Sequence, residues 1–355
     1  MGITGRVEPN TSQRYYNASR GIVIGSCRDR KGSVDVTAPT IGLPQALVYH
    51  KYFPLWREFF TELGAEVAVS RPTDKRVLNA GLEAAESELC LPVKLFFGHV
   101  LELADEVDFV FVPRIVAVEG DAFTCPKLLG LPDMITALDT VPSVLSETFN
   151  LKKGLKDFYS SVYRVGSVCS SNWRSIWRAW RAGVKAQAEY ERELRSGFTP
   201  LDLLGQGIKA EKEDLRIGVV GHAYNIYDRH LSMDLVNRLR KAGGKVVTSE
   251  MLGHHVIERE LHRLPKRLFW SYEKEVVGSA FHFIHSGNVD GLIFLLSFAC
   301  GPDSLTQVII EYEARKHGNL PMMSLVVDEH SGEAGMATRV EAFIDMLRWQ
   351  KGRVS

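Results

Sequence analysis

The chain has 355 residues, of which 45% are hydrophobic and 24% are charged, and its formal net charge is zero. A chain of this length can bury two or three ordinary cores, and zero net charge gives no electrostatic basis for binding nucleic acid. No apolar run reaches about 18 residues, and the N-terminus lacks the build of a signal peptide, so we expect neither a membrane span nor export. Five cysteines, an odd number, favour a reducing cytoplasm over a disulfide scaffold.

Residues 1–38 are rich in Gly, Ser, Asn and Arg and are expected to form a flexible extension. From Thr40 onward, strand and helix patterns alternate. They comprise the strand TIGLPQAL, the helix YFPLWREFFTELG with a predicted end at Gly64, the strand AEVAVS and the near-continuous apolar strand DFVFVPRIVAV. This alternation predicts a first α/β domain over residues 39–150.

Residues 151–212 are predicted to be a helical connector. Its tryptophans Trp173, Trp177 and Trp180 are spaced as a packing stripe rather than a ligand platform, and its basic residues are interpreted as a solvated helix face. Residues 213–355 repeat the alternation through LRIGVVG, VDGLIFLLSFACG and PMMSLVVDEH. The predicted fold class is therefore α/β, with two Rossmann-like or flavodoxin-like parallel-sheet domains, and ligands are expected at the carboxyl ends of the strands.

Three cysteines stand at the predicted starts of helices, each beside Pro or Gly: Cys90 in ELCLP, Cys125 in FTCPK and Cys300 in FACGP. Helix N-termini stabilise thiolates. Structural zinc usually takes a Cys-x-x-Cys pair, which this chain lacks, whereas an iron–sulfur cubane gathers thiolates from separate loops. Buried cysteines that serve only as small apolar residues fit the same pattern, so the pattern alone leaves both interpretations open.

Four further residues are candidates for acid–base chemistry. His99 lies in the helix that follows Cys90 and is a candidate proton donor, although a histidine satisfied within its helix is the commoner case. Asp328, Glu329 and His330 follow a predicted strand in a Gly-containing loop, and a carboxylate beside a histidine suits general acid–base catalysis. A loop that caps the last helix is the alternative interpretation of these three residues.

The turn after LRIGVVG is a further candidate site. It carries the polar side chains His222, Tyr224, Asn225 and Asp228, which would either line a pocket for an anionic ligand or hold the turn itself. Asp303, three residues after Cys300, is interpreted as part of a helix N-cap.

Five segments spread over residues 40–350 occur together in one order: SELCLPVKLFFGH, VPRIVAVEGDAFTCPKLLGLPDM, IGVVGHAYNIYD, LLSFACGPDSL and VDEHSGEAGMATRVEAFIDML. Together they resemble the acyl-CoA dehydratase activase-related family, the domain of unknown function numbered 2229, often labelled CoA-substrate-specific enzyme activase. This family is related to the iron–sulfur subunits of 2-hydroxyacyl-CoA dehydratases, benzoyl-CoA reductases and double-cubane cluster proteins.

The resemblance implies a 4Fe–4S cluster held between paired α/β domains by Cys90, Cys125 and Cys300. It also implies low-potential electrons from an ATP-hydrolysing activase partner, because this chain has no G-x-x-x-x-G-K-[ST] motif. The implied reaction is a reduction or dehydration of a small or CoA-linked substrate at the open iron. A homodimer or a related iron–sulfur subunit would be a source of the fourth ligand.

Two alternatives stay open beside this implied function. One is a non-catalytic electron-transfer or scaffold subunit of such a system, and the other is a zinc or redox-thiol protein. Neither the substrate nor whether the chain is itself an enzyme follows from the sequence.

Overall fold

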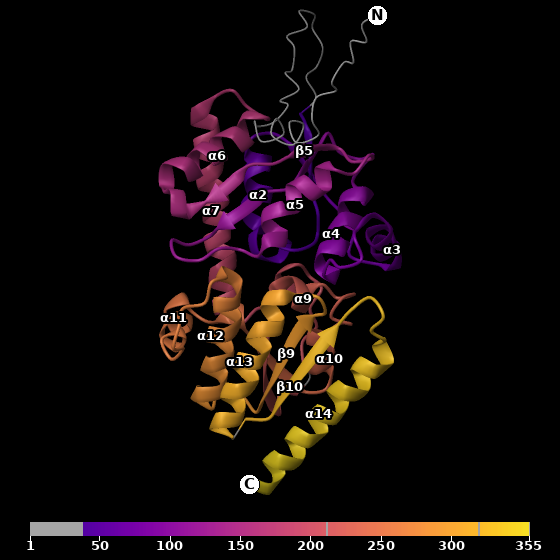
Figure 1. Cartoon of the computed structure of the whole chain (residues 1–355), viewed down its shortest axis with the longest axis vertical. Coiled ribbons are helices and arrows are strands. Elements are labelled where there is room, and N and C mark those ends of the chain that lie inside the picture. Colours follow the sequence, from indigo (N-terminus) through magenta and orange to yellow (C-terminus); the bar gives the residue numbers. More distant parts are fainter. Residues whose placement is uncertain (1–37, 211, 319, 355) are drawn as a thin grey trace, which may run out of the picture. The chain divides into compact units, whose positions relative to one another are not determined.

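The computed structural model describes residues 38–210, 212–318 and 320–354. The predicted extension over residues 1–38 therefore lies outside the described residues, except for Ala38. Among the described residues, no helix is long and apolar enough to cross a membrane. The α/β fold class is confirmed, because the strands form parallel sheets that helices cover (Figure 1).

The first sheet is fully parallel and has the strand order β2-β1-β3-β5. Its strands are β1 (Thr40–Leu43), β2 (Glu66–Val69), β3 (Phe109–Phe111) and β5 (Ser143–Leu145). One face packs against α2 (Tyr49–Glu62), α6 (Leu155–Ser167) and α7 (Trp173–Arg195). The other face packs against α4 (Leu91–Glu102) and α5 (Pro126–Thr136).

The second sheet is also parallel and has the order β10-β9-β7-β8. Its strands are β7 (Leu215–Val220), β8 (Gly244–Thr248), β9 (Gly291–Ser297) and β10 (Met322–Val327). One face packs against α10 (Leu235–Lys241) and α14 (Glu333–Val354). The other packs against α12 (Ser271–Ser286) and α13 (Gly301–His317), which lie side by side in Figure 1.

Both sheets have the same topology. Numbered along the chain within each sheet, the strands run second, first, third, fourth across the sheet. In such sheets the loops after the first and third strands part to opposite faces, and ligands bind in the crevice between them. The loops after β1, β3, β7 and β9 therefore mark the expected binding region.

The remaining elements connect these layers. They are α3 (Lys75–Ala84), β4 (Arg114–Ala117), β6 (Thr148–Asn150), η1 (Leu151–Lys153), α8 (Pro200–Leu203), α9 (Ala223–Tyr227), η2 (Ser249–Met251) and α11 (His254–Leu261). Residues 38–355 form one compact unit, and the predicted domain boundaries at residues 150 and 212 stay predictions.

Two sequence expectations were wrong in detail. DFVFVPRIVAV is not one strand: Pro113 separates β3 from β4, which pairs with β6 in a separate two-stranded ladder, because proline has no N–H to donate. The tryptophan stripe is only partly a packing stripe. Trp180 is 8% exposed and contacts Trp56, whereas Trp173 and Trp177 are 61% and 42% exposed.

The helix that follows Cys90 is held by a close backbone contact. A Cβ atom on Gly81 of α3 would lie 2.0 Å from the carbonyl oxygen of Lys94, and one on Gly98 of α4 would lie 2.0 Å from that of Val77. Only glycine at both positions lets the two helices approach this closely. The contact sets the position of α4 and hence of Cys90 at its start.

We expect Gly98→Ala to destabilise the protein by about 2 kcal/mol or more, because the new methyl group would collide with backbone that has no rotamer to change. Urea unfolding measures the difference. Gly130→Ala is the matched control, since it lies within α5 with nothing inside 4 Å of its added Cβ, and it should leave stability unchanged or raise it by up to about 1 kcal/mol. Equal midpoints for Gly98→Ala and the wild type would contradict the close-contact argument.

Candidate functional site

Each of the three predicted cysteines occupies the N-cap of a helix. Cys90 precedes α4, Cys125 precedes α5 and Cys300 precedes α13. In each helix, either the first or the second residue is a proline. Proline fits there because the first N–H groups of a helix have no intrahelical acceptor. The predicted helix starts are confirmed.

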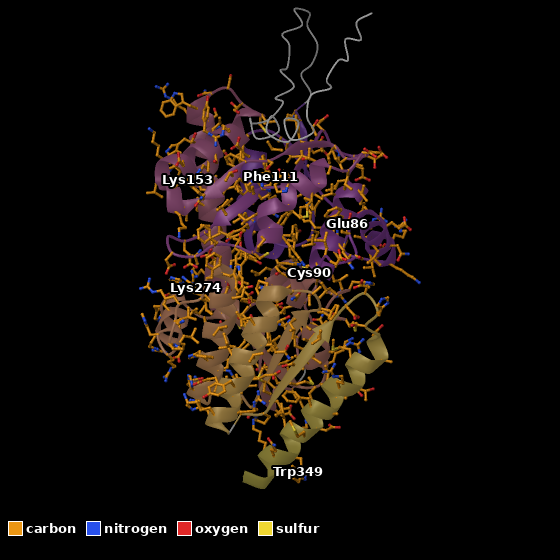
Figure 2. The ribbon with its side chains drawn as sticks, viewed as in Figure 1. Glu86, Cys90, Phe111, Lys153, Lys274 and Trp349 are labelled. Carbon is orange, nitrogen blue, oxygen red and sulfur yellow. The ribbon has the colours of Figure 1, made fainter. Side chains whose placement is uncertain are left out.

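The fold brings these three cysteines together. Cys90 and Cys300 are buried in one apolar cluster, and Cys125 packs against it. Figure 2 labels Cys90 where the helices of the first sheet meet those of the second. Tyr224 lies near all three thiols: burial raises its pKa well above the ordinary value, and negative charge on any of the three sulfurs acts in the same direction.

As free thiols, two of the cysteines are protonated at neutral pH. Burial raises the pKa of Cys300 to about 11, although a hydrogen bond with His222 opposes the shift. Burial also raises the pKa of Cys125, and the backbone N–H of Leu128 opposes it. A metal that bound here would have to displace these protons, as metals do when they bind cysteine.

A buried histidine with two carboxylates lies beside Cys300. Nε2 of His222, at the N-cap of α9, is 3.2 Å from Oδ1 of Asp303 and 3.3 Å from Oε1 of Glu273. Burial acts to lower the pKa of His222. The negative charge of Asp303, with the polar contacts that His222 makes to Cys300 and Glu273, outweighs burial and raises the pKa well above the ordinary value. His222 is therefore an imidazolium at neutral pH.

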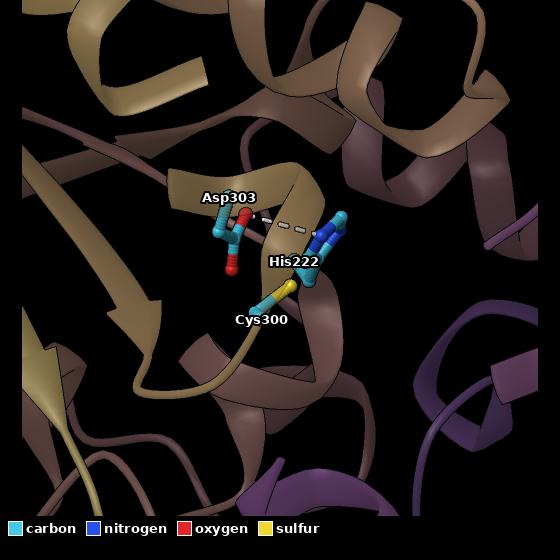
Figure 3. A group of neighbouring side chains, drawn as sticks. All are labelled: His222, Cys300 and Asp303. Atoms are coloured by element: carbon cyan, nitrogen blue, oxygen red, sulfur yellow. Dashed lines mark ion pairs between the residues drawn. The ribbon is translucent and has the colours of Figure 1, made fainter. Parts of the chain in front are cut away.

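Asp303 is fully buried without a hydrogen-bond donor. Its Oδ1 is at ion-pair distance from His222, but the alignment falls short of a hydrogen bond, and neither oxygen finds a donor among the described residues. Figure 3 shows His222, Cys300 and Asp303 gathered at the start of α13, and their donor atoms all lie within 4.8 Å of one another. Asp303 therefore depends on its ion pair with His222 for a counter-charge.

A small pocket, with a cavity volume of about 20 Å³, adjoins this site. Its polar lining comprises Lys51, His222, Tyr224, Glu250, Tyr272 and Glu275. Lys51 forms an ion pair with Glu275. Burial and the nearby charge of Glu275 raise the pKa of Glu250, whose Oε2 accepts a 2.7 Å hydrogen bond from the Tyr227 hydroxyl. The pocket thus places the carboxyl groups of Glu250 and Glu275 and the ammonium group of Lys51 next to the cysteine site.

The backbone is strained at two of the loops that form the site. Leu47, in the pocket wall after β1, has φ 51°, and Ala299, directly before Cys300, has φ 61°. Residues with a Cβ seldom adopt this left-handed conformation, and such strain gathers at functional sites.

His99 lies away from the cysteines. It is nine residues beyond Cys90, about 13 Å along α4. Its Nδ1 is 2.9 Å from the Ser70 hydroxyl and its Nε2 is 2.9 Å from that of Thr73, and burial lowers its pKa to about 4. A catalytic role for His99 stays a prediction, and this placement favours a structural histidine.

The carboxylates of Asp328 and Glu329 already have hydrogen-bond partners, within the loop for Asp328 and on α4 for Glu329. Asp328 Oδ1 accepts bonds from the His330 N–H and the Ser331 hydroxyl, at 3.0 and 2.7 Å. Glu329 Oε1 accepts a 2.7 Å bond from Nζ of Lys94, which is buried one turn after Cys90. Their acid–base role stays a prediction. The contact shows that Glu329 ties the last loop to the first cysteine helix.

Sequence reasoning passed over Glu273 and gave Asp303 only a capping role. Glu273 lies on the buried face of α12, in register with Val276, Val277 and Ala280. An acidic residue at an apolar position of a helix is the signal that would have found it.

The sequence model of a protein family described as the CoA enzyme activase uncharacterised domain matches residues 40–252, more than half of the chain. The chain belongs to this family. A second family model, described as 2-hydroxyglutaryl-CoA dehydratase, D-component, matches residues 184–347. The first match includes Cys90 and Cys125 and the second includes Cys300, so the resemblance seen in the five segments is confirmed.

No curated protein matches this chain. Among solved structures, it is similar to the C-terminal domain of glucosamine-fructose-6-phosphate aminotransferase from Francisella tularensis. The identity is 11%, the match covers 87% of this chain and 81% of the other, and the TM-score is 0.20. So low a score supports no argument about fold or function.

The Lys94–Glu329 pair yields a pH-dependent prediction. Burial alone would raise the pKa of Glu329, but the hydrogen bond from Lys94 outweighs it, so the pKa is lowered on folding. The stabilisation is therefore present above the unfolded value of about 4.3 and is lost as the pH falls through the folded value.

At pH 7, Glu329→Gln should lower the free energy of unfolding by about 3 kcal/mol, because it leaves a buried ammonium without its counter-charge. Urea unfolding should show this deficit shrinking below about pH 4. The control is Glu333→Gln at the start of α14, whose carboxylate is 74% exposed beside Arg238 and should change stability by under about 1 kcal/mol. A constant deficit from pH 7 to pH 3 would refute the ion-pair explanation.

Proposed function

We propose that this protein binds a 4Fe–4S cluster through Cys90, Cys125 and Cys300 and receives low-potential electrons from an ATP-hydrolysing activase partner. The observation that carries the proposal is the convergence of three N-cap cysteines around Tyr224. The cluster would serve a reduction or dehydration of a small or CoA-linked substrate, as in the dehydratases to which the second family match points.

The donor set fits a cluster better than it fits a single ion. A tetrahedral zinc with Zn–S bonds of about 2.3 Å needs its sulfurs about 3.8 Å apart. Among the described residues, the groups of three donors within 4.8 Å of one another each contain at most one cysteine. The three thiols lie in one cluster yet more widely spaced than one ion requires, which supports a polynuclear centre.

The chain's own residues would hold such a centre by charge. Three helix N-termini direct N–H groups and positive dipole ends toward the thiolates, and the imidazolium of His222 adds a positive charge beside Cys300. When bound, a cubane with three protein thiolates supplies one-electron transfer and one iron open to a further ligand. Tyr224 keeps its proton and can donate a hydrogen bond to sulfur.

The charged groups beside the cysteines favour an enzyme over a simple electron relay. A relay needs no acid–base groups, whereas Lys51, Glu275 and Glu250 line the pocket that adjoins the cysteine site. The side chain of Lys51 can orient an anionic group, and Glu250, with its raised pKa, can carry a proton. A cytoplasmic location and a homodimer or paired iron–sulfur subunit stay predictions.

A second candidate rests on a different observation. His222, Cys300 and Asp303 place one imidazole, one thiol and one carboxylate within 4.8 Å, a donor set of the kind that holds a catalytic zinc with an open position. This mononuclear site would need neither Cys90 nor Cys125. Cysteine variants therefore separate the two candidates.

Protein purified without oxygen should contain about four irons and four acid-labile sulfides per chain, with the broad visible absorption of a cubane. Cys90→Ala, Cys125→Ala and Cys300→Ala should each lose most of the iron. The control is Cys169→Ala, a partly buried cysteine that packs in a different core cluster and should keep the wild-type iron content.

Stoichiometric zinc that survives Cys90→Ala and disappears in Cys300→Ala and His222→Ala would replace the cluster by the mononuclear site. No metal in any form after anaerobic reconstitution would refute both candidates. Urea unfolding of each variant shows whether a lost metal reflects a lost ligand or a lost fold.

The choice between enzyme and relay can be tested on the reduced protein. An acyl-CoA thioester that reaches the pocket should change the electron paramagnetic resonance spectrum of the reduced cluster. We expect Lys51→Met to keep the iron content while weakening this response, because it removes the pocket cation that would orient an anionic group. If a panel of thioesters of different acyl chains leaves the spectrum unchanged, the electron-relay alternative is favoured.

A further inference from the structure

A second group of metal-binding side chains lies at the other end of α12 and α13. His285 is in the last turn of α12, and Glu313 and His317 are in the last turns of α13. The donor atoms of these three residues lie within 4.8 Å of one another. Because α13 has 17 residues, this group lies about 25 Å from Cys300 at its start.

The distances match the edges of a small coordination polyhedron. Oε1 of Glu313 is 3.1 Å from Nε2 of His285 and 3.0 Å from Nε2 of His317. Ligands at about 2.0 Å from a tetrahedral zinc are about 3.3 Å apart. The second oxygen of Glu313 lies 3.7 Å from Nζ of Lys316, which leaves Oε1 for an ion.

The remaining ring nitrogen of His285 is held by another carboxylate. Its Nδ1 is 3.0 Å from Oε2 of Glu260 in α11, and the same oxygen accepts a 2.7 Å bond from Nε of Arg263. Nε2 of the same ring faces Oε1 of Glu313. A metal ion between them would take the lone pair of Nε2 while Glu260 held Nδ1–H. Carboxylates oriented in this way behind a histidine are the usual support of a metal ligand.

The local field also favours a cation. Both helices end here, with Gly287 and Gly318 as left-handed C-caps, so the negative ends of two helix dipoles point at the group. The side chains of His285 and Glu313 are 9% and 10% exposed and that of His317 is 42% exposed. An ion can therefore enter from the side of His317.

We propose that His285, Glu313 and His317 bind one divalent first-row transition-metal ion, with Zn²⁺ as the expected occupant, and so clamp the C-terminal ends of α12 and α13 together. Two imidazoles and one carboxylate select such an ion over Mg²⁺ or Ca²⁺, which prefer oxygen ligands alone. Glu260 is a positioning residue for His285. The site is independent of the cysteines, and its metal would be structural rather than part of the cluster chemistry.

The test is competition of the full-length protein, stripped with chelator, against a chromophoric chelator for Zn²⁺. Wild type should bind one more zinc equivalent than His317→Ala and than Glu313→Gln. Glu260→Gln should weaken that equivalent by about 10- to 100-fold while retaining it. The control is His254→Ala, which removes an exposed histidine paired with Glu258 at the same i, i+4 spacing but outside the groups of three donors found among the described residues.

Co²⁺ substitution separates the two centres, because cobalt on cysteine gives thiolate charge-transfer absorption and cobalt on histidine and carboxylate does not. Zinc should raise the melting temperature of wild type and of Cys300→Ala but not of His317→Ala. Equal zinc stoichiometry and affinity in wild type, His317→Ala and Glu313→Gln would overturn the proposal. Iron and sulfide contents should be the same in all these histidine variants, so failure here leaves the cluster proposal untouched.

Discussion

The convergence of three helix N-termini on one buried place is the constraint on which the cysteine site depends. Cys90, Cys125 and Cys300 each begin a helix, so N–H groups without intrahelical acceptors and three positive dipole ends meet there. The imidazolium of His222 adds to this field, and Asp303 and Glu273 offset it. Without that positive environment, the burial of the Asp303 and Glu273 carboxylates beside the cysteines would be more costly.

The repeated topology explains why the site lies where it does. Both sheets have one strand order, and the loops after β1, β7 and β9 supply the pocket wall, His222 and Cys300. The position of α4 is set by its close backbone contact with α3, and the Lys94–Glu329 pair ties that helix to the loop after β10. The candidate site therefore takes residues from the loops and helices of both sheets, and neither sheet alone supplies all of them.

The helices α12 and α13 connect two different kinds of chemistry. At their starts they present Glu273, Asp303 and Cys300, and at their ends they present His285, Glu313 and His317. The dipoles suit this division, since N-termini favour anionic ligands and C-termini favour cations. A metal ion at the far ends would fix the spacing of the two helices that position the buried carboxylates beside the cysteines.

Local pattern was enough for the α/β class, most strands and the three helix starts, because alternation, Pro and Gly act over a few neighbouring residues. It did not show that Pro113 divides one apolar run or that Trp173 and Trp177 are exposed to solvent. It also did not show that the hydroxyl groups of Ser70 and Thr73 form hydrogen bonds with both ring nitrogens of His99. Nor did it bring His222, Glu273 and Asp303 together. Their meeting depends on how β7, α12 and α13 pack, and contacts between residues so distant in the chain leave no local period in the sequence.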